Sequence, residues 1–207
     1  MVTTLQARNV RLSALRRCFG LEWVRNLDFF PEWQEVLPDL SKRERIFLDG
    51  VREGYFSQLQ GDEDVLEKVV QLTVVSPLLC GAGLYITPFE IRAEKSIEIE
   101  TEDDGVIIKG TLDILIIRHN VWVMVIESKK AEYSIEAGLA QLLSYLLAHP
   151  NPDGICYGLL ASGSDFIFIK FVRNEQGVKY GTSDQFAMRR SDDIYQVFRI
   201  LKRLTQS

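Results

Sequence analysis

Two adjacent apolar segments joined by a short polar turn constrain this chain more than any other feature. Val106–Ile117 and Val121–Ile126 are rich in β-branched residues, and Arg118-His-Asn120 separates them. This pattern predicts a β-hairpin. The first strand carries Asp113 in its middle, and the second runs directly into Glu127-Ser-Lys129. Charged groups in a hydrophobic sheet are costly to bury unless a partner compensates them, so the hairpin is expected to hold a functional site.

The spacing of the charged residues predicts that they converge. If the turn is tight and the ladder is regular, the numbers of paired residues sum to about 238, and Asp113 lies near Val125. Glu127 and Lys129 then follow at intervals of two, on the same face of the sheet. Diagonal cross-strand neighbours are roughly 7–8 Å apart, which lets two carboxylates share one ion.

Two carboxylates and an amine at one point suit magnesium chemistry. Mg²⁺ prefers hard oxygen ligands and takes one or two carboxylates together with phosphate oxygens. The metal would polarise a scissile phosphate and acidify a water molecule, and Lys129 would orient that water or stabilise charge on phosphorus. The backbone carbonyl of Ser128 is a candidate further ligand. The alternative for each fragment alone is a solvent-facing strand acid or a charged strand end.

A helix is predicted after the second strand, over residues 131–149. Its leucines recur at helical spacing, at positions 139, 142, 143 and 146, and a Pro-Asn-Pro segment follows. Gln141 and Tyr145 are four residues apart and therefore share one face. We interpret them as support for Lys129 and for a nucleic-acid backbone, against the alternative of an ordinary helix surface.

A second helix is predicted over residues 62–76, ending at Pro77. Its Glu67 is a candidate for a further carboxylate at the site, acting on the metal directly or through water. The alternative is that Glu67 belongs to an acidic, solvated first turn.

These motifs together resemble the PD-(D/E)xK nuclease superfamily over residues 62–172. The most similar group comprises the N-terminal nuclease domain of type I restriction enzyme motor subunits and its small stand-alone bacterial relatives. There a helix with an acid runs into a Pro-Leu-Leu segment, as Glu67 runs into Pro77-Leu-Leu79 here. The resemblance implies that Asp113 and Glu127 bind metal, that Lys129 is catalytic, and that Gln141 and Tyr145 support the site.

The chain departs from the family pattern in two ways. Leu112 stands where many members have proline before the acid; many others tolerate this change. No Gly-Lys-Ser/Thr phosphate loop is present, so no helicase motor is expected. We therefore expect a stand-alone nuclease, a subunit or a relic rather than a complete motor subunit.

Composition is that of an ordinary globular protein: 207 residues, 46% hydrophobic, net charge −5. Three cysteines without metal spacing indicate free thiols in a reducing cytoplasm, and no apolar run is long enough for a membrane span. The acidic balance argues against a nonspecific nucleic-acid coat, which needs a basic surface. It leaves a nuclease possible.

The fold class predicted is α/β: a restriction-endonuclease-like core with a mixed central sheet flanked by helices. Residues 1–60 are expected to form a helical N-terminal extension packed on the core, and 61–207 the nuclease-like domain. Beyond the hairpin, the pattern predicts strands at 89–100, 155–160 and 166–172 and a helix over 192–204.

The leading functional hypothesis is Mg²⁺-dependent hydrolysis of DNA, with Mn²⁺ able to substitute, in defence or repair. The alternative is a catalytically silent nuclease-like module that binds nucleic acid or protein within a larger complex. A homodimer, or a partner in a restriction complex, is compatible with either hypothesis.

Overall fold

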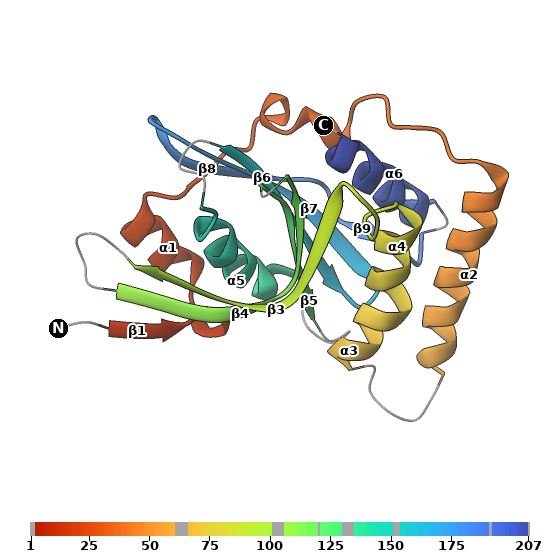
Figure 1. Cartoon of the computed structure of the whole chain (residues 1–207), viewed down its shortest axis with the longest axis horizontal. Coiled ribbons are helices and arrows are strands. Elements are labelled where there is room, and N and C mark those ends of the chain that lie inside the picture. Colours follow the sequence, from red (N-terminus) through yellow and green to blue (C-terminus); the bar gives the residue numbers. More distant parts are fainter. Residues whose placement is uncertain are drawn as a thin grey trace.

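A mixed sheet of nine strands organises the molecule, as the computed structural model in Figure 1 shows. The structure describes residues 3–60, 66–100, 106–119, 121–129, 135–150, 154–190 and 192–206. The strands are β1 (Thr3–Gln6), β2 (Glu22–Trp23), β3 (Phe89–Glu100), β4 (Val106–Arg118), β5 (Val121–Lys129), β6 (Gly154–Ser162), β7 (Asp165–Asn174), β8 (Gly177–Thr182) and β9 (Phe186–Ala187).

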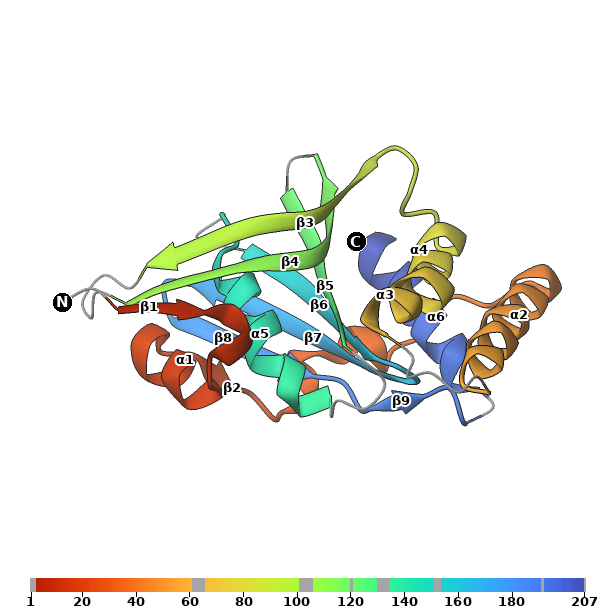
Figure 2. The same ribbon diagram turned by 90° about the horizontal axis from the view of Figure 1, so that it is seen from below.

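Helices lie on both sides of this sheet (Figures 1 and 2). They are α1 (Leu12–Phe19), α2 (Lys42–Gln58), α3 (Glu67–Val70), α4 (Ser76–Gly81), α5 (Ile135–Leu147) and α6 (Asp193–Gln206), with short 3₁₀ turns at 7–9, 27–29 and 31–33. The sheet flanked by helices confirms the predicted α/β class. The predicted strands and the C-terminal helix are present within a few residues of their expected bounds.

The strand connections explain why the sheet is mixed. β3, β4 and β5 form an antiparallel meander, and α5 then crosses over to β6, which is parallel to β5. β6, β7 and β8 are again antiparallel. Two short N-terminal strands add to the sheet in parallel, β1 on β4 and β2 on β8. Four strands, β1, β2, β8 and β9, were not predicted from the sequence, because each is short or lacks a clear apolar alternation.

The register of the β4–β5 hairpin differs from the predicted one. Ile116 pairs with Met124, whereas the next residue, Ile117, pairs with Trp122, so Val123 is an extra residue. At the tip of the hairpin the numbers of paired residues already sum to 239, one more than predicted, and the bulge adds one more, so the site end is shifted by two positions from the predicted register. The expectation that Asp113 lies near Val125 is therefore wrong. The pair Ile114–Ile126 places Asp113 directly across from Glu127 instead.

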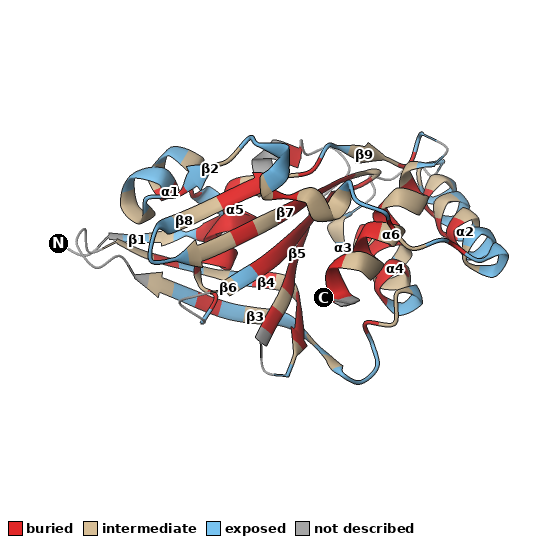
Figure 3. Ribbon diagram, turned by 90° about the horizontal axis from the view of Figure 1, so that it is seen from above, coloured by how far each residue is buried: buried red, intermediate tan, exposed pale blue. Residues whose placement is uncertain are grey.

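Two hydrophobic cores lie on opposite faces of the sheet. The sheet curves around α5, which buries Leu142, Leu143 and Leu146 in one core together with α1. The other face packs against α2, α4 and α6, and its core includes Leu48, Leu79 and Phe198. Figure 3 shows the result: β5, β7 and α5 are largely buried, whereas α2 is exposed along much of its length.

The helix that begins at Glu67 continues past Pro77, where it was predicted to end. A π-helical stretch over Gln71–Val75 separates α3 from α4 and places Pro77 near the start of α4. Proline lacks an N–H and clashes with the carbonyl four residues earlier in a regular helix. The wider turn before Pro77 accommodates both effects, so the chain stays helical to Gly81.

The first 60 residues contribute β1 and β2 to the sheet as well as two helices. α2 begins with a complete capping box, in which Ser41 and Glu44 each bind the other's backbone N–H. The division of the chain at residue 60 stays a prediction. No helix among the described residues is long and apolar enough to cross a membrane.

Candidate active site

The candidate site lies where β4 changes partners. β3 pairs along one edge of β4 from residue 107 to 118. On the other edge, β1 pairs with residues 106–109 and β5 with residues 114–118. Residues 110–113 therefore face a gap between two strands, and Asp113 is at its end. Opposite this gap, the last residues of β5 lie beside α3 (Figures 1 and 2).

Asp113 is held by Ser128 through two hydrogen bonds. The backbone N–H and the hydroxyl of Ser128 both donate to Asp113 Oδ2, each at 2.7 Å. The Ser128 hydroxyl in turn accepts from Gln71 Nε2 at 2.7 Å. Gln71 is in the π-helical stretch, a kind of irregularity that is frequent at functional sites. This chain of bonds fixes one carboxylate oxygen of Asp113.

Glu127 is a buried carboxylate with an incomplete set of partners. Its side chain is 1% exposed, and Lys129 Nζ donates to Oε1 at 2.5 Å. The other oxygen, Oε2, is buried and has no hydrogen-bond partner. Burial raises the pKa of Glu127 to about 8, the negative charge of Asp113 adds to the rise, and Lys129 opposes it. The ionised form of Glu127 is therefore poorly compensated by the protein itself.

Glu67 and Lys68 bring further charge to the site from the start of α3. The charge of Glu67 contributes to the raised pKa of Glu127, after burial and Asp113. Lys68 donates to Glu94 at 2.8 Å, and this bond is the main reason that the pKa of Lys68 is raised. Asp113 and Glu67 also contribute to that rise. Four carboxylates (Glu67, Glu94, Asp113 and Glu127) and two amines (Lys68 and Lys129) thus act on one another here.

Gln141 and Tyr145 lie on the α5 side of the same gap. Gln141 Nε2 donates to Tyr145 Oη at 2.7 Å, and that hydroxyl donates to the carbonyl of Thr111 at 3.0 Å. Burial and then the charge of Glu127 raise the pKa of Tyr145. The bond expected from this pair to Lys129 is not formed in the described residues, where Lys129 binds Glu127.

A glycine makes room for the tyrosine. A Cβ at Gly110 would lie 2.7 Å from Ala7 Cβ and 2.9 Å from Tyr145 Cε1. These distances are shorter than real Cβ contacts, so any side chain at Gly110 would displace the ring from the gap. The bare backbone of β4 therefore lets Tyr145 replace the missing ladder partner of Thr111.

The residues present fit a magnesium ion. Among the described residues, no group of three His, Cys, Asp or Glu side chains has metal-binding geometry. Mg²⁺ needs fewer protein ligands, because it keeps several waters and is held by one or two carboxylates. The carboxylates of Glu127, with its unpartnered Oε2, and of Asp113 opposite it are a ligand set of that kind. Ser128, whose carbonyl was predicted as a ligand, is fixed there by its N–H bond to Asp113.

Two residues of this network, Gln71 and Lys68, were not predicted from the sequence. Gln71 follows Glu67 by four positions, the same spacing that singled out Gln141 and Tyr145, and could have been found by it. Lys68 carried no such signal, because its relation to Glu94 depends on how α3 meets β3.

Comparison with known proteins gives little beyond this geometry. No protein-family model matches the chain, and no curated protein matches it. Among 14 matching chains of solved structures is one described as "cryoEM structure DrdV-DNA complex". It is 9% identical, the alignment covers 76% of this chain and 96% of that one, and the TM-score is 0.48. The function is therefore inferred from the geometry of the site.

Proposed function

We propose that this protein hydrolyses phosphodiester bonds of DNA in a Mg²⁺-dependent reaction. One observation carries the proposal: the buried Glu127 has an unpartnered oxygen and a raised pKa directly across from a second carboxylate, Asp113. Proteins rarely leave a buried acid in this state unless a cation completes it. Asp113 and Glu127 would hold the Mg²⁺, or a substituting Mn²⁺. Glu67 would add a contact through water, and the Ser128 carbonyl is a further candidate ligand.

The side chains have separate tasks in this reaction. When bound, Mg²⁺ supplies electrostatic stabilisation of the scissile phosphate and acidifies a water molecule. A water oxygen forms the new bond to phosphorus as the bridging P–O bond breaks, and the departing oxygen takes up a proton. Lys129, paired with Glu127, would donate to the attacking water or to a phosphate oxygen. Gln141 and Tyr145 would keep the gap open and support the site.

The resemblance to PD-(D/E)xK nucleases supports DNA as the substrate. The chain carries the family's acid, Glu-x-Lys and Gln-x-x-x-Tyr positions at Asp113, Glu127–Lys129 and Gln141–Tyr145. On this basis we place it with the stand-alone bacterial relatives of type I restriction nuclease domains, acting in the cytoplasm in defence or repair. It would act as a homodimer or with a partner subunit.

The test combines DNA cleavage with metal binding. Circular and linear DNA are incubated with the protein and Mg²⁺ or Mn²⁺, with EDTA as the blank. Lys129→Ala should lower the cleavage rate by at least about 100-fold, whereas Lys109→Ala, an exposed strand lysine paired with Glu98, should leave it unchanged. Nicking of circular DNA would identify an endonuclease.

Calorimetry of Mg²⁺ binding separates the possible failures. Binding that disappears in Asp113→Asn supports the metal site even if the DNA tested is not cut. If wild type and Lys129→Ala are equally silent and no binding depends on Asp113, catalysis is ruled out, and a nuclease-like binding module takes its place.

A further inference from the structure

An uncovered stripe runs along one side of α2. The helix buries Leu48, Val51 and Tyr55 against the core. A second stripe, spaced three or four residues apart, faces the side where α4 lies and consists of Arg43, Ile46, Phe47, Gly50 and Gly54. Ile46 is 62% exposed and Phe47 is 39% exposed. Large apolar side chains of an outer helix are thus left open to solvent beside a neighbouring helix.

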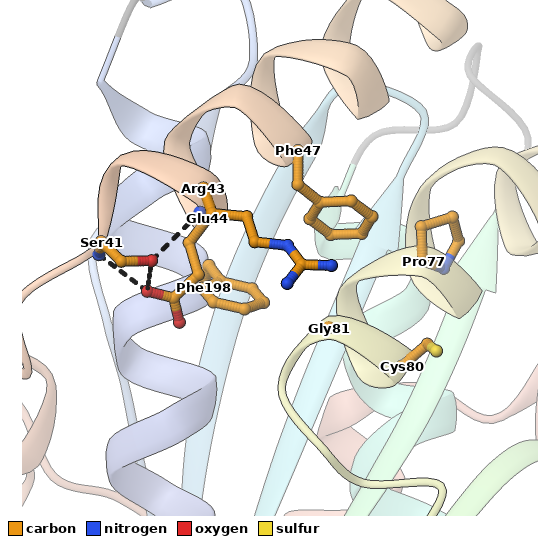
Figure 4. Close-up of a pocket in the computed structure, with 8 residues that line it drawn as sticks. All are labelled: Ser41, Arg43, Glu44, Phe47, Pro77, Cys80, Gly81 and Phe198. Carbon is orange, nitrogen blue, oxygen red and sulfur yellow. Dashed lines mark hydrogen bonds between the residues drawn. The ribbon is translucent and has the colours of Figure 1, made fainter.

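Residues of this stripe line two hollows, and Phe47 and Pro77 border both of them. The first has a volume of about 410 Å³ and lies between α2, α4 and α6, with Phe47, Pro77 and Phe198 around it (Figure 4). The second is a shallower, more open depression of about 470 Å³ that continues along α2 past Gly50 and Gly54, again bordered by Phe47 and Pro77. We call the two together the α2 trough. From Ser41 to Gly54 it extends about 20 Å, or nearly four helical turns.

The floor of the trough is closely packed. A Cβ at Gly81 would lie 2.8 Å from Phe47 Cε1 and 3.1 Å from Phe198 Cε2. Only a glycine lets these two rings approach α4 as they do. Phe47, which borders both hollows, therefore lies directly against α4.

Gly50 and Gly54 leave the backbone of α2 open along the trough. Both lie inside α2, where glycine weakens a helix compared with alanine. An added Cβ at either position would meet nothing within 4 Å, so no contact within the described residues requires a glycine there. A second backbone lying close against α2 would require it, because small residues allow close approach of two main chains.

The charge of the trough selects the partner. Arg43 projects over the first hollow between Phe47 and Phe198 (Figure 4), and none of the described acidic side chains forms an ion pair with it. The neighbouring Glu44 is already paired with Lys202 and capped by Ser41. An apolar trough with one free cation at one end is complementary to an apolar surface with an acid at the matching end.

We propose that the α2 trough binds an amphipathic helix of a partner protein, with apolar anchors about two turns apart and an acidic residue facing Arg43. This inference is independent of the proposed nuclease activity, because the trough is lined by residues of α2, α4 and α6 and by Thr73, and none of them belongs to the candidate site. The protein would thereby be held in a larger assembly while its site faces the substrate.

The experiment uses the full chain and a displayed library of 16-residue helical peptides with randomised faces. Selected peptides should carry one acidic residue and two apolar anchors seven positions apart. Their affinity should fall at least tenfold for Phe47→Asp and for Arg43→Glu. Lys42→Glu is the matched control, since it makes the same charge change on the same helix outside the trough, and it should leave binding unchanged.

A glycine variant keeps the test independent of folding. Gly50→Ala with Gly54→Ala should raise the thermal midpoint by about 2–4 °C per substitution and yet weaken peptide binding. An absence of binders, or binders insensitive to Phe47→Asp and to the glycine variant, would overturn the proposal. Concentration-dependent self-association abolished by Phe47→Asp would also overturn it, by making a second copy the occupant.

Discussion

Two lysine–glutamate pairs in this molecule look alike and differ in what surrounds them. Lys129–Glu127 lies at the end of β5, and Lys170–Glu32 joins β7 to the 3₁₀ turn at Pro31–Trp33. In both pairs the amine is 2.5 Å from Oε1, and in both the other oxygen, Oε2, is buried without a partner. An unpartnered carboxylate oxygen is therefore not by itself a mark of a metal site.

The neighbours of each pair make the difference. Glu32 also accepts from the hydroxyl of Tyr157 at 3.1 Å, so two donors serve its Oε1. Glu127 has one donor and lies across from Asp113, and its pKa is raised by burial and by that second carboxylate. A second carboxylate beside the buried glutamate therefore distinguishes the candidate metal site from the structural ion pair.

The largest expected effect is on the rate of DNA cleavage, which should depend on Glu127 and not on Glu32. Glu127→Gln should lower Mg²⁺-dependent DNA cleavage by about 1,000-fold or more, because it removes a metal-binding charge. Glu32→Gln should change the rate less than about twofold, since it contacts no part of the site. Initial rates of plasmid cleavage measure both. Equal losses of cleavage rate in the two variants would show that Glu127 is no more important for catalysis than Glu32.

The second effect is a pH dependence of stability in the metal-free protein. The pKa of Glu127 is raised from 4.5 to about 8. Below pH 4.5 Glu127 is protonated in both the folded and the unfolded chain, and its contribution to the unfolding free energy is fully present. Between 4.5 and 8 the unfolded state loses the proton first, so stability falls as pH rises, by up to about 1.4 kcal/mol per pKa unit.

Urea unfolding at pH 5 and pH 8 in EDTA measures this fall. Glu127→Gln should remove most of it, whereas Glu32→Gln should not. A wild-type stability that does not fall from pH 5 to pH 8, or a fall that Glu127→Gln leaves unchanged, contradicts the assignment.

The third effect concerns the structural pair. Lys170→Met leaves the charge of Glu32 with one neutral donor and should destabilise the fold by about 2–4 kcal/mol. Adding Glu32→Gln should restore more than half of this loss, because the uncompensated charge is gone. The unfolding midpoints of the single and double variants measure the coupling, and additive effects would show that the pair is not an energetic unit.

The smallest expected effect is a difference in unfolding free energy between variants of the two tyrosines that lie beside these pairs. Tyr145→Phe deprives the Thr111 carbonyl of its donor and should cost about 1–2 kcal/mol of unfolding free energy. Tyr157→Phe should cost less, about 0.5–1 kcal/mol, since Lys170 still donates to Glu32. Chemical denaturation of both variants provides the measurement, and the reverse order would contradict the ranking.

Much of this arrangement could be predicted without coordinates. The β-branched runs on either side of Arg118–Asn120 identify the hairpin, and the leucines of α5 identify the crossover helix. Strong periodicity is local information, and the structure confirms these elements. The site assignments drawn from them stay predictions that the cleavage and metal-binding experiments test.

The failures have a common cause. The bulge at Val123 is invisible in a continuous apolar strand, yet it decides that Asp113 faces Glu127 rather than Ile126. Pro77 alone predicts a helix end, but the π-helical turn before it lets the helix continue. Both outcomes depend on packing against neighbouring elements, which outweighs local preference.

By itself, the sequence determined the β4–β5 hairpin, the crossover helix α5, the longer strands on either side of them and the C-terminal helix, and it singled out the candidate metal-site residues. Periodicity and residue type act over a few positions, and the chain displays them directly. Only the tertiary structure decided which of the two buried acids faces a second carboxylate and which accepts a further hydrogen bond, because other segments bring Asp113 beside Glu127 and Tyr157 beside Glu32. Burial and converging charge are properties of contacts between segments, and these form only when the sheet assembles.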